Sequence, residues 1–199
     1  MNPVIRRIRA GAVWVCGAGV SMAAQAHAGG TGVLSAWLHP LTGADHLAAM
    51  IAVGAWSVQL GGRAVWGVPV AFLSFMLVGG VVGFQLIDLA GVEFGVALSV
   101  LLLGLAIALD RRTATIPAAA AVGAFGFCHG YLHGYELTVL EQPVWATLGF
   151  LTTTAMLHVA GLVAGHFARR SSAGQRLLRG CGWLVAVFGC WLLASRALG

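Results

Sequence analysis

The chain has 199 residues, of which 59% are apolar and only 9% are charged, and it contains 29 glycines and no lysine. Together with a mean hydropathy of +0.91, this composition excludes an ordinary soluble domain and predicts an all-α, polytopic membrane bundle. The net charge of +5 does not indicate nucleic-acid binding, because the arginines gather at the N-terminus and in short loops, where they set membrane orientation.

Residues 1–28 have the pattern of a secretory signal peptide. Three arginines form its positive n-region: Arg6, Arg7 and Arg9. An apolar stretch follows, and Ala26-His27-Ala28 is an A-x-A cleavage site. We expect cleavage after Ala28, so that the mature protein begins at Gly29 and residues 29–199 form one transmembrane domain. The alternative is an uncleaved N-terminal anchor.

Six apolar segments follow, each close to the roughly 20 residues that a helical span requires. They cover residues 40–60, 64–87, 92–109, 116–137, 145–168 and 177–197. The short connections between them predict an antiparallel bundle of six transmembrane helices. Every arginine beyond the signal peptide except Arg196 falls in the loops after the first, third and fifth segments when these are taken as residues 61–63, 110–112 and 169–179. By the positive-inside rule these loops face the cytoplasm, so both termini are expected outside.

Small residues recur at four-residue spacing in three of the segments. The stripes are Gly79 and Gly83, then Gly126, Gly130 and Gly134, then Gly161 and Gly165. Such stripes allow close helix contacts in lipid, where packing rather than water drives association. We therefore expect these faces to lie at helix interfaces.

Ionisable side chains inside or beside the apolar segments are the main functional signal. They are His39, Asp45, His46, His129, His133, Glu136 and His158. Groups that are costly in lipid are expected to face the bundle interior and to mark an ion path or a reactive site. Imidazoles and carboxylates without a thiolate pair suit Ni²⁺, Co²⁺ or Zn²⁺ and suit Cu(I) poorly. For His158 alone, a helix-to-helix hydrogen bond is an equal alternative.

Helical rise arranges these side chains by depth. His39, His133 and Glu136 form an outer set, Asp45, His46 and His129 a middle set, and His158 lies deepest. In this interpretation Pro40 begins the first helix, with His39 outside it as a residue of the mouth. Asp45 and His46 point in different directions on an ideal helix. We expect one of them to bind the ion and the other to support a histidine from the fourth or fifth segment.

The residues also resemble a known family. Residues 39–56, 127–136 and 154–161, with their H-x5-D-H and H-G-x-x-H-G-x-E motifs, are similar to three signatures of the HupE/UreJ family of hydrogenase and urease accessory membrane proteins. The resemblance implies a small bacterial inner-membrane permease for Ni²⁺, or in some relatives Co²⁺, that supplies maturation of hydrogenase or urease. It implies no enzymatic activity and no prosthetic group. The family's motif positions fall on His39, Asp45, His46, His129, His133 and Glu136, with His158 in the third signature.

The sequence departs from the family pattern at three points. Cys128 stands where Phe or another apolar residue is usual, and Leu132 stands where Ala or Val is usual. The expected mature chain begins Gly29-Gly30-Thr31 and lacks the His-rich stretch that many relatives carry there. The changes at Cys128 and Leu132 remove no ligand position, whereas the missing His-rich stretch argues against an outer metal-collecting tail.

Two alternative functions are compatible with the polar residues. One is an intramembrane hydrolase whose His/Asp-bound Zn²⁺ activates water, and the other is an accessory scaffold that binds metal without passing it. A ladder of ligands along the membrane normal favours transport over a single closed catalytic site. The sequence leaves open the choice among Ni²⁺, Co²⁺ and Zn²⁺, the energy coupling, and whether the protein forms a homo-oligomer.

The signal sequence and the loop charges make a direct topological prediction. Protein extracted from membranes should begin at Gly29, and a reporter fused to the C-terminus should be active on the outer side of the membrane. N-terminal sequencing and the reporter assay check the two parts. An intact Met1 or a cytoplasmic reporter would contradict this topology.

Overall fold

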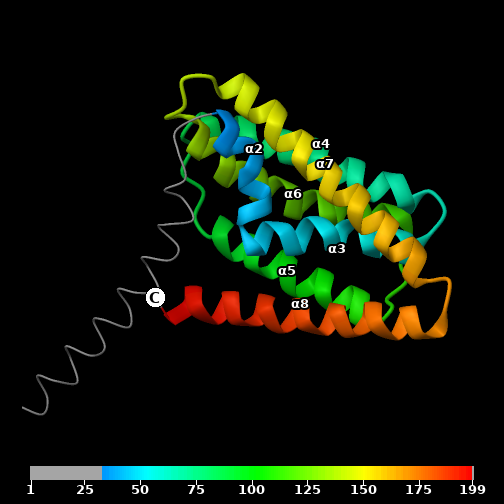
Figure 1. Ribbon diagram of the computed structural model, residues 1–199. Coiled ribbons are helices and arrows are strands. Elements are labelled where there is room, and N and C mark those ends of the chain that lie inside the picture. Colours follow the sequence, from blue (N-terminus) through cyan, green and yellow to red (C-terminus); the bar gives the residue numbers. More distant parts are fainter. Residues whose placement is uncertain (1–32, 199) are drawn as a thin grey trace, which may run out of the picture. The chain divides into compact units, whose positions relative to one another are not determined.

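The computed structural model describes residues 33–198, and the expected signal peptide and its cleavage site lie outside the described residues. Seven helices make up this part of the chain (Figure 1). They are α2 (Val33–Thr42), α3 (Ala44–Leu60), α4 (Ala64–Phe84), α5 (Val92–Ala108), α6 (Thr115–Leu137), α7 (Pro143–Ala168) and α8 (Ser172–Leu198). Because residues 33–198 contain no strand, the all-α prediction is confirmed for them.

Four helices in the described part, α4, α6, α7 and α8, are long and apolar enough to cross a membrane. The apolar helix α5 has 17 residues, or about 26 Å, which is slightly less than the hydrocarbon thickness of about 30 Å. Large apolar side chains such as Trp66, Met156 and Val187 are exposed on these helices. Such a surface fits lipid rather than water, so the chain is a multi-pass membrane protein. Six spans would also require α3 and α5 to cross.

The first predicted span is not one continuous helix. We expected a helix over residues 40–60 that begins at Pro40, but Pro40 lies inside α2, and α3 starts only at Ala44. His39 is therefore helical in its backbone, although its side chain lies outside the described residues. Proline cannot donate a backbone hydrogen bond, and Gly43 adopts an extended conformation (φ −80°, ψ 110°). These two features separate α2 from α3.

The helices associate chiefly in three pairs, α4 with α6, α5 with α8, and α3 with α7. Glycines bring the backbones of each pair together, as the stripes predicted for α4, α6 and α7. A Cβ atom on Gly79 would collide with the Phe127 carbonyl group, and one on Gly161 with the Ile51 carbonyl group. In the α5–α8 pair Gly104 has the same role. Helix packing in this bundle therefore depends on positions without a side chain.

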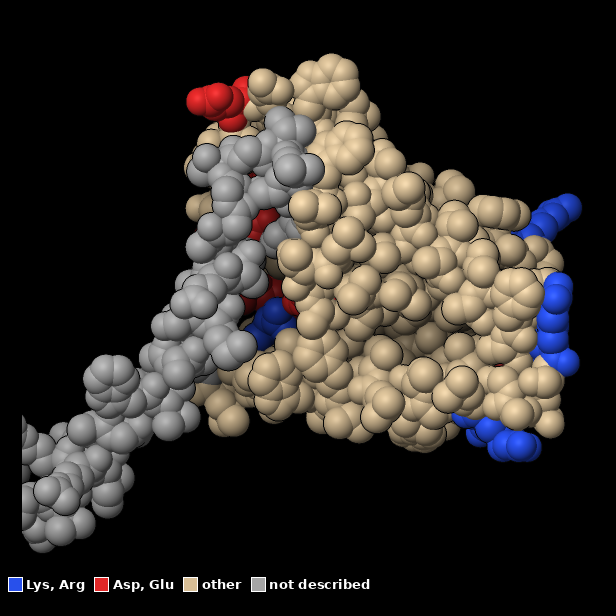
Figure 2. Space-filling model, in the orientation of Figure 1, with Lys and Arg blue, Asp and Glu red and all other residues tan. Residues whose placement is uncertain are grey.

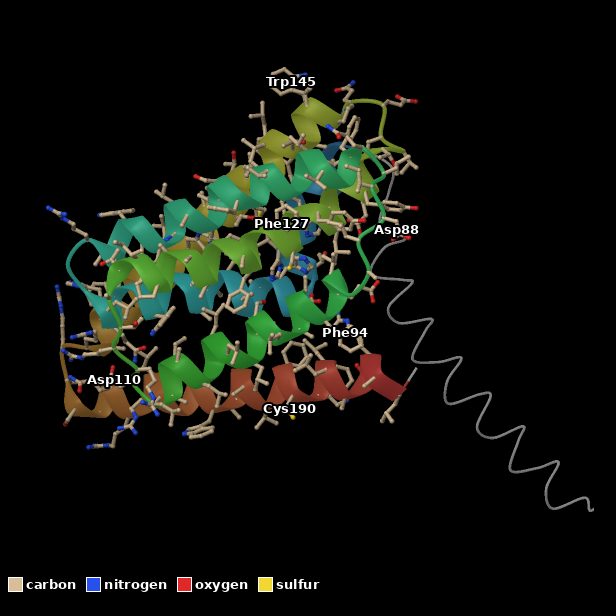
Figure 3. The ribbon with its side chains drawn as sticks, turned by 180° about the vertical axis from the view of Figure 1, so that it is seen from behind. Asp88, Phe94, Asp110, Phe127, Trp145 and Cys190 are labelled. Carbon is tan, nitrogen blue, oxygen red and sulfur yellow. The ribbon has the colours of Figure 1, made fainter. Side chains whose placement is uncertain are left out.

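The two ends of the bundle differ in charge. Arginines gather at the end where loops join α3 to α4, α5 to α6 and α7 to α8 (Figures 1 and 2). There Arg169 donates to the Val58 and Gln59 carbonyl oxygens (2.9 and 2.7 Å), and Arg179 donates to that of Ala108 (2.9 Å). These bonds satisfy carbonyl groups at the C-terminal ends of α3 and α5. Figure 3 shows Asp88 at the opposite end from Asp110.

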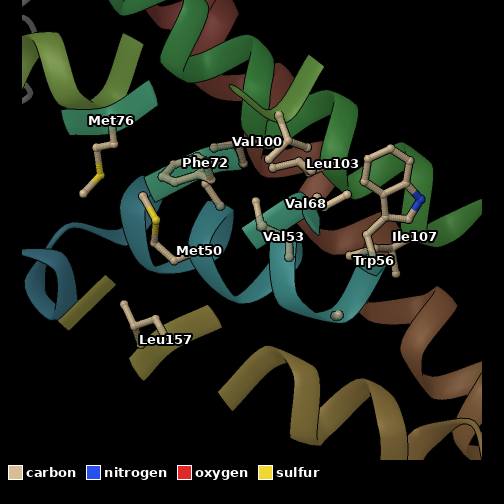
Figure 4. Packing of buried hydrophobic residues seen from close by; sticks show 14 of the residues in the cluster. Met50, Val53, Trp56, Val68, Phe72, Met76, Val100, Leu103, Ile107 and Leu157 are labelled. Carbon is tan, nitrogen blue, oxygen red and sulfur yellow. The ribbon is translucent and has the colours of Figure 1, made fainter. Parts of the chain in front are cut away.

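The apolar core lies between α3, α4 and α5. Met50, Val53, Phe72 and Val100 are fully buried there, and Figure 4 shows them packed together. Met50, one turn below His46, belongs to this core. The apolar core lies directly below the polar residues of α3 and α6.

The glycine contacts predict a sharp contrast between two neighbouring positions of α4. Gly79→Ala would drive a Cβ into the backbone of α6, whereas a Cβ on Gly80 would lie 3.6 Å from the nearest atom, the Gly130 carbonyl oxygen. Gly79→Ala should cost about 1–3 kcal/mol through overpacking, and Gly80→Ala should be nearly neutral. Thermal unfolding in detergent measures both variants. Equal stability of the two would contradict the close α4–α6 contact.

Candidate metal site

Three buried imidazoles meet between α3 and α6. His46 lies in the first turn of α3, and His129 and His133 lie one turn apart on α6. The His46 ring centroid is 4.9 Å from that of His129 and 4.5 Å from that of His133. The Nε2 atoms of His46 and His133 are only 2.7 Å apart. The structure thus brings together three of the histidines selected from the sequence.

The glycine stripe of α6 explains why these histidines face inward. Gly130 and Gly134, which each follow a histidine, have their Cα positions against the backbones of Met76 and Gly80 in α4. Because this side of α6 is occupied by α4, the adjacent side carries His129 and His133 into the bundle. His133 also packs on the ring of Phe150 from α7, with centroids 3.9 Å apart.

Each of the two facing imidazoles has its own carboxylate. Asp45 Oδ1 accepts hydrogen bonds from Nδ1 (2.8 Å) and the backbone N–H (2.9 Å) of His46. Glu136 Oε2 accepts from His133 Nδ1 at 3.1 Å. Since an ionised carboxylate can only accept, the proton of each neutral imidazole lies on Nδ1. Each Nε2 then carries a lone pair.

One expectation about this cluster was wrong. Asp45 supports its own neighbour His46 rather than a histidine from another helix, because side-chain rotation brings together groups whose Cβ atoms diverge. His133, expected in the outer set, contacts His46 of the middle set. One helical turn is about 5.4 Å, and two opposed imidazole rings span that distance.

Arg196 is a further member of the site that the sequence did not indicate as one. Its Nη2 lies 3.6 Å from Asp45 Oδ2, and its Nε lies 3.9 Å from Glu93 Oε2. In the sequence, Arg196 stood out only as the single arginine outside the predicted inner loops. That exception to the charge pattern was the available signal. The two ion pairs connect α8 to the N-terminal turns of α3 and α5.

Ser99 of α5 is the second residue that sequence reasoning missed. Its Oγ lies 3.0 Å from His129 Nε2, and it donates a 2.6 Å hydrogen bond to the Val96 carbonyl oxygen. Both Ser99 and His129 are fully buried. A serine in an otherwise apolar segment was the only sequence signal, and no spacing rule connects it to α6.

His158 lies deeper in the bundle, on α7, and is 2% exposed. The Phe72 ring packs against both His158 and His129, with centroid distances of 5.1 and 5.5 Å. Among the described residues, neither nitrogen of His158 has a hydrogen-bond partner, nor do His129 Nδ1 and Thr154 Oγ1. Unpaired buried polar groups typically cost about 1–3 kcal/mol each. These buried nitrogen and oxygen atoms are therefore available to bind a ligand.

The remaining sequence candidates lie away from this cluster or at its edge. The Glu136 side chain is 43% exposed, as expected for the mouth. His166 is exposed, and its Nε2 lies 3.1 Å from an Arg170 nitrogen. Among the side chains that the structure describes, which do not include His39, no three His, Cys, Asp or Glu residues converge into a metal cage. The cluster instead offers paired imidazoles that a cation can share.

Comparisons with known proteins agree with the motifs. Residues 14–192 match the family described as HupE / UreJ protein. Protein HupE from Rhizobium leguminosarum bv. viciae is 42% identical over 174 residues, which cover 86% of this chain and 91% of the relative. No solved structure matches the chain. All three sequence signatures fall within the matched region, and the chain belongs to the HupE/UreJ family.

Proposed function

We propose that this protein is a permease that carries a divalent transition metal inward across the bacterial inner membrane, with Ni²⁺ as the expected cargo and Co²⁺ or Zn²⁺ as alternatives. Both termini face outward in this proposal. The observation that carries it is the pair of Nε2 atoms that face each other from His46 and His133.

Two lone pairs at this separation repel each other. Because Asp45 and Glu136 accept from the Nδ1 atoms, neither Nε2 of the neutral rings has a proton to donate. A separation of 2.7 Å becomes favourable when a proton, as in an N–H···N hydrogen bond, or a metal cation lies between the two nitrogens. The buried pair is therefore organised to receive a positive charge.

The separation is close to what a shared metal ion needs. Bonds of about 2.0–2.1 Å from a metal to imidazole nitrogen, at angles between octahedral and tetrahedral values, set the two nitrogens about 2.9–3.4 Å apart. The observed 2.7 Å requires only a few tenths of an ångström of opening. Carboxylates behind metal-binding imidazoles fix the ring orientation and increase ligand basicity.

The deeper polar atoms support passage rather than simple storage. His129 Nδ1, Thr154 Oγ1 and both nitrogens of His158 offer further ligands within the bundle. A cation that leaves the outer pair would meet these atoms in turn. No phosphate-binding loop for ATP exists in a chain without lysine, so we propose that the membrane potential drives uptake. That potential supplies about 4.6 kcal/mol per 100 mV for a divalent ion.

The family suggests the destination of the metal. Membership of the HupE/UreJ family implies an accessory role for hydrogenase or urease. We therefore propose that this permease supplies metal for the maturation of such an enzyme. We propose no catalytic activity of its own. A hydrolase would hold its metal in one closed ligand set beside a substrate cleft, whereas the side chains here are distributed along α3, α6 and α7.

The histidines of α6 provide the main test. His129→Ala and His133→Ala should each abolish Ni²⁺ uptake into liposomes that contain the purified protein, because each removes an imidazole from the shared cluster. His166→Ala, which changes an exposed histidine, is the matched control and should leave uptake nearly unchanged. Equal loss in all three variants, with equal amounts of folded protein, would contradict the proposed site.

Asp45 tests whether the carboxylate acts through His46. Asp45→Asn keeps a hydrogen-bond acceptor beside Nδ1 but removes the charge, so Ni²⁺ affinity should fall about 10- to 100-fold. Asp88→Asn makes the same change at an exposed site at the same end of the bundle and serves as the control. Calorimetric titration of the purified protein measures both.

Two results of the Asp45 experiment would change the assignment. Complete loss of binding would mean that the charge of Asp45 itself neutralises the ion. Unchanged affinity would refute both roles and leave Asp45 as an acidic residue that stabilises the N-terminus of α3.

A further inference from the structure

Ser99 lies outside the sequence motifs, and it forms a buried pair with the motif residue His129. Ser99 belongs to α5 and His129 to α6, and both side chains are fully buried. The Ser99 hydroxyl makes two contacts, one with the Val96 carbonyl oxygen at 2.6 Å and one with His129 Nε2 at 3.0 Å. From these contacts we propose that Ser99 holds His129 in the Nε2-protonated tautomer, so that Nδ1 is the nitrogen presented to the transported cation.

Counting protons gives the direction of each hydrogen bond. A serine hydroxyl has one hydrogen, and a carbonyl oxygen can only accept. The hydroxyl hydrogen is therefore used by Val96, and the remaining contact of Ser99 Oγ must be an acceptor contact. His129 Nε2–H donates to it. In a neutral imidazole with a proton on Nε2, the Nδ1 atom carries the lone pair.

The opposite tautomer would be unfavourable on both sides of the ring. The Nε2 lone pair would then face an oxygen lone pair of Ser99 at 3.0 Å. The Nδ1–H would also become a buried donor, and within the described residues Nδ1 has no hydrogen-bond partner. An unpaired buried donor loses its hydration without compensation. The Ser99 contact removes both problems.

This tautomer makes His129 complementary to the other two imidazoles. In His46 and His133, a carboxylate at Nδ1 leaves the lone pair on Nε2. In His129, the hydroxyl at Nε2 leaves the lone pair on Nδ1. The inference that Nδ1 serves the cation rests on the proposed permease function, but the tautomer itself does not. Ser99 is thus a positioning residue, because it acts through His129.

The tautomer can be observed directly by NMR. Imidazole nitrogens that carry a proton and those that carry a lone pair have well-separated ¹⁵N shifts. The full-length protein, labelled with ¹⁵N-histidine and free of metal in detergent at neutral pH, should show His129 with a protonated Nε2. A His129→Asn sample identifies the signal. His158, whose nitrogens have no partner among the described residues, is an internal reference that should not respond to changes at Ser99.

Two variants of equal shape separate the hydroxyl from packing. Ser99→Thr keeps the hydroxyl, whereas Ser99→Val replaces it by a methyl group and has the same steric demand. The Nε2-protonated signal should persist in Ser99→Thr and become a mixture of tautomers in Ser99→Val. In liposomes, the KM for Ni²⁺ should rise about 10- to 100-fold in Ser99→Val and stay near the wild-type value in Ser99→Thr. If the added methyl groups prevent folding, Ser99→Ala removes only the oxygen and should behave as Ser99→Val.

The outcomes distinguish this proposal from the permease function. A protonated Nδ1 on His129 in the wild-type protein, or an unchanged tautomer in Ser99→Val and Ser99→Ala, would overturn the role of Ser99. A changed tautomer with an unchanged KM would overturn the presentation of Nδ1 to the cation. If wild-type liposomes take up no metal, the permease function fails, whereas the NMR spectra still decide whether Ser99 sets the tautomer.

Discussion

The contact between the His46 and His133 imidazoles determines how the rest of this structure can be understood. Two ring nitrogens 2.7 Å apart are a favourable contact only when a proton or a metal ion lies between them. To reach this arrangement, the first turn of α3 must meet the later turns of α6. The glycine contacts of α6 with α4 and of α3 with α7 bring the helices close enough for this. Close helix packing at glycine positions therefore allows the polar cluster to form.

Support for the imidazoles declines from the proposed outer end toward the interior. His46 and His133 each have a carboxylate, His129 has a neutral hydroxyl, and His158 has no hydrogen-bond partner among the side chains that the structure describes. In the proposed permease, a cation would be best compensated at the outer end and less well compensated farther inward. Such a gradient would favour capture at the outer end and leave the inward step to the membrane potential. Arg196, paired with Asp45, places a competing positive charge beside this outer end.

The sequence predicted those features that depend on local pattern or composition. Helix content, the glycine faces around Gly79, Gly130 and Gly161, and the burial of His129 follow from hydropathy and residue spacing. The break at Gly43 was missed because a single glycine inside an otherwise helical pattern does not by itself end a helix. The partners of Asp45, and the participation of Ser99 and Arg196, were missed for another reason. They depend on side-chain rotation and on contacts between helices distant in the chain, which spacing along one helix does not encode.

The central claim is that the imidazole cluster conducts a divalent transition metal through the bundle. The most direct measurement is the flux of Ni²⁺, Co²⁺ and Zn²⁺ into liposomes that contain only the purified protein, with a potential negative inside. We predict saturable Ni²⁺ entry that increases with the potential and exceeds entry into protein-free liposomes. Tight metal binding without entry of any of the three ions would contradict transport and identify the protein as a scaffold.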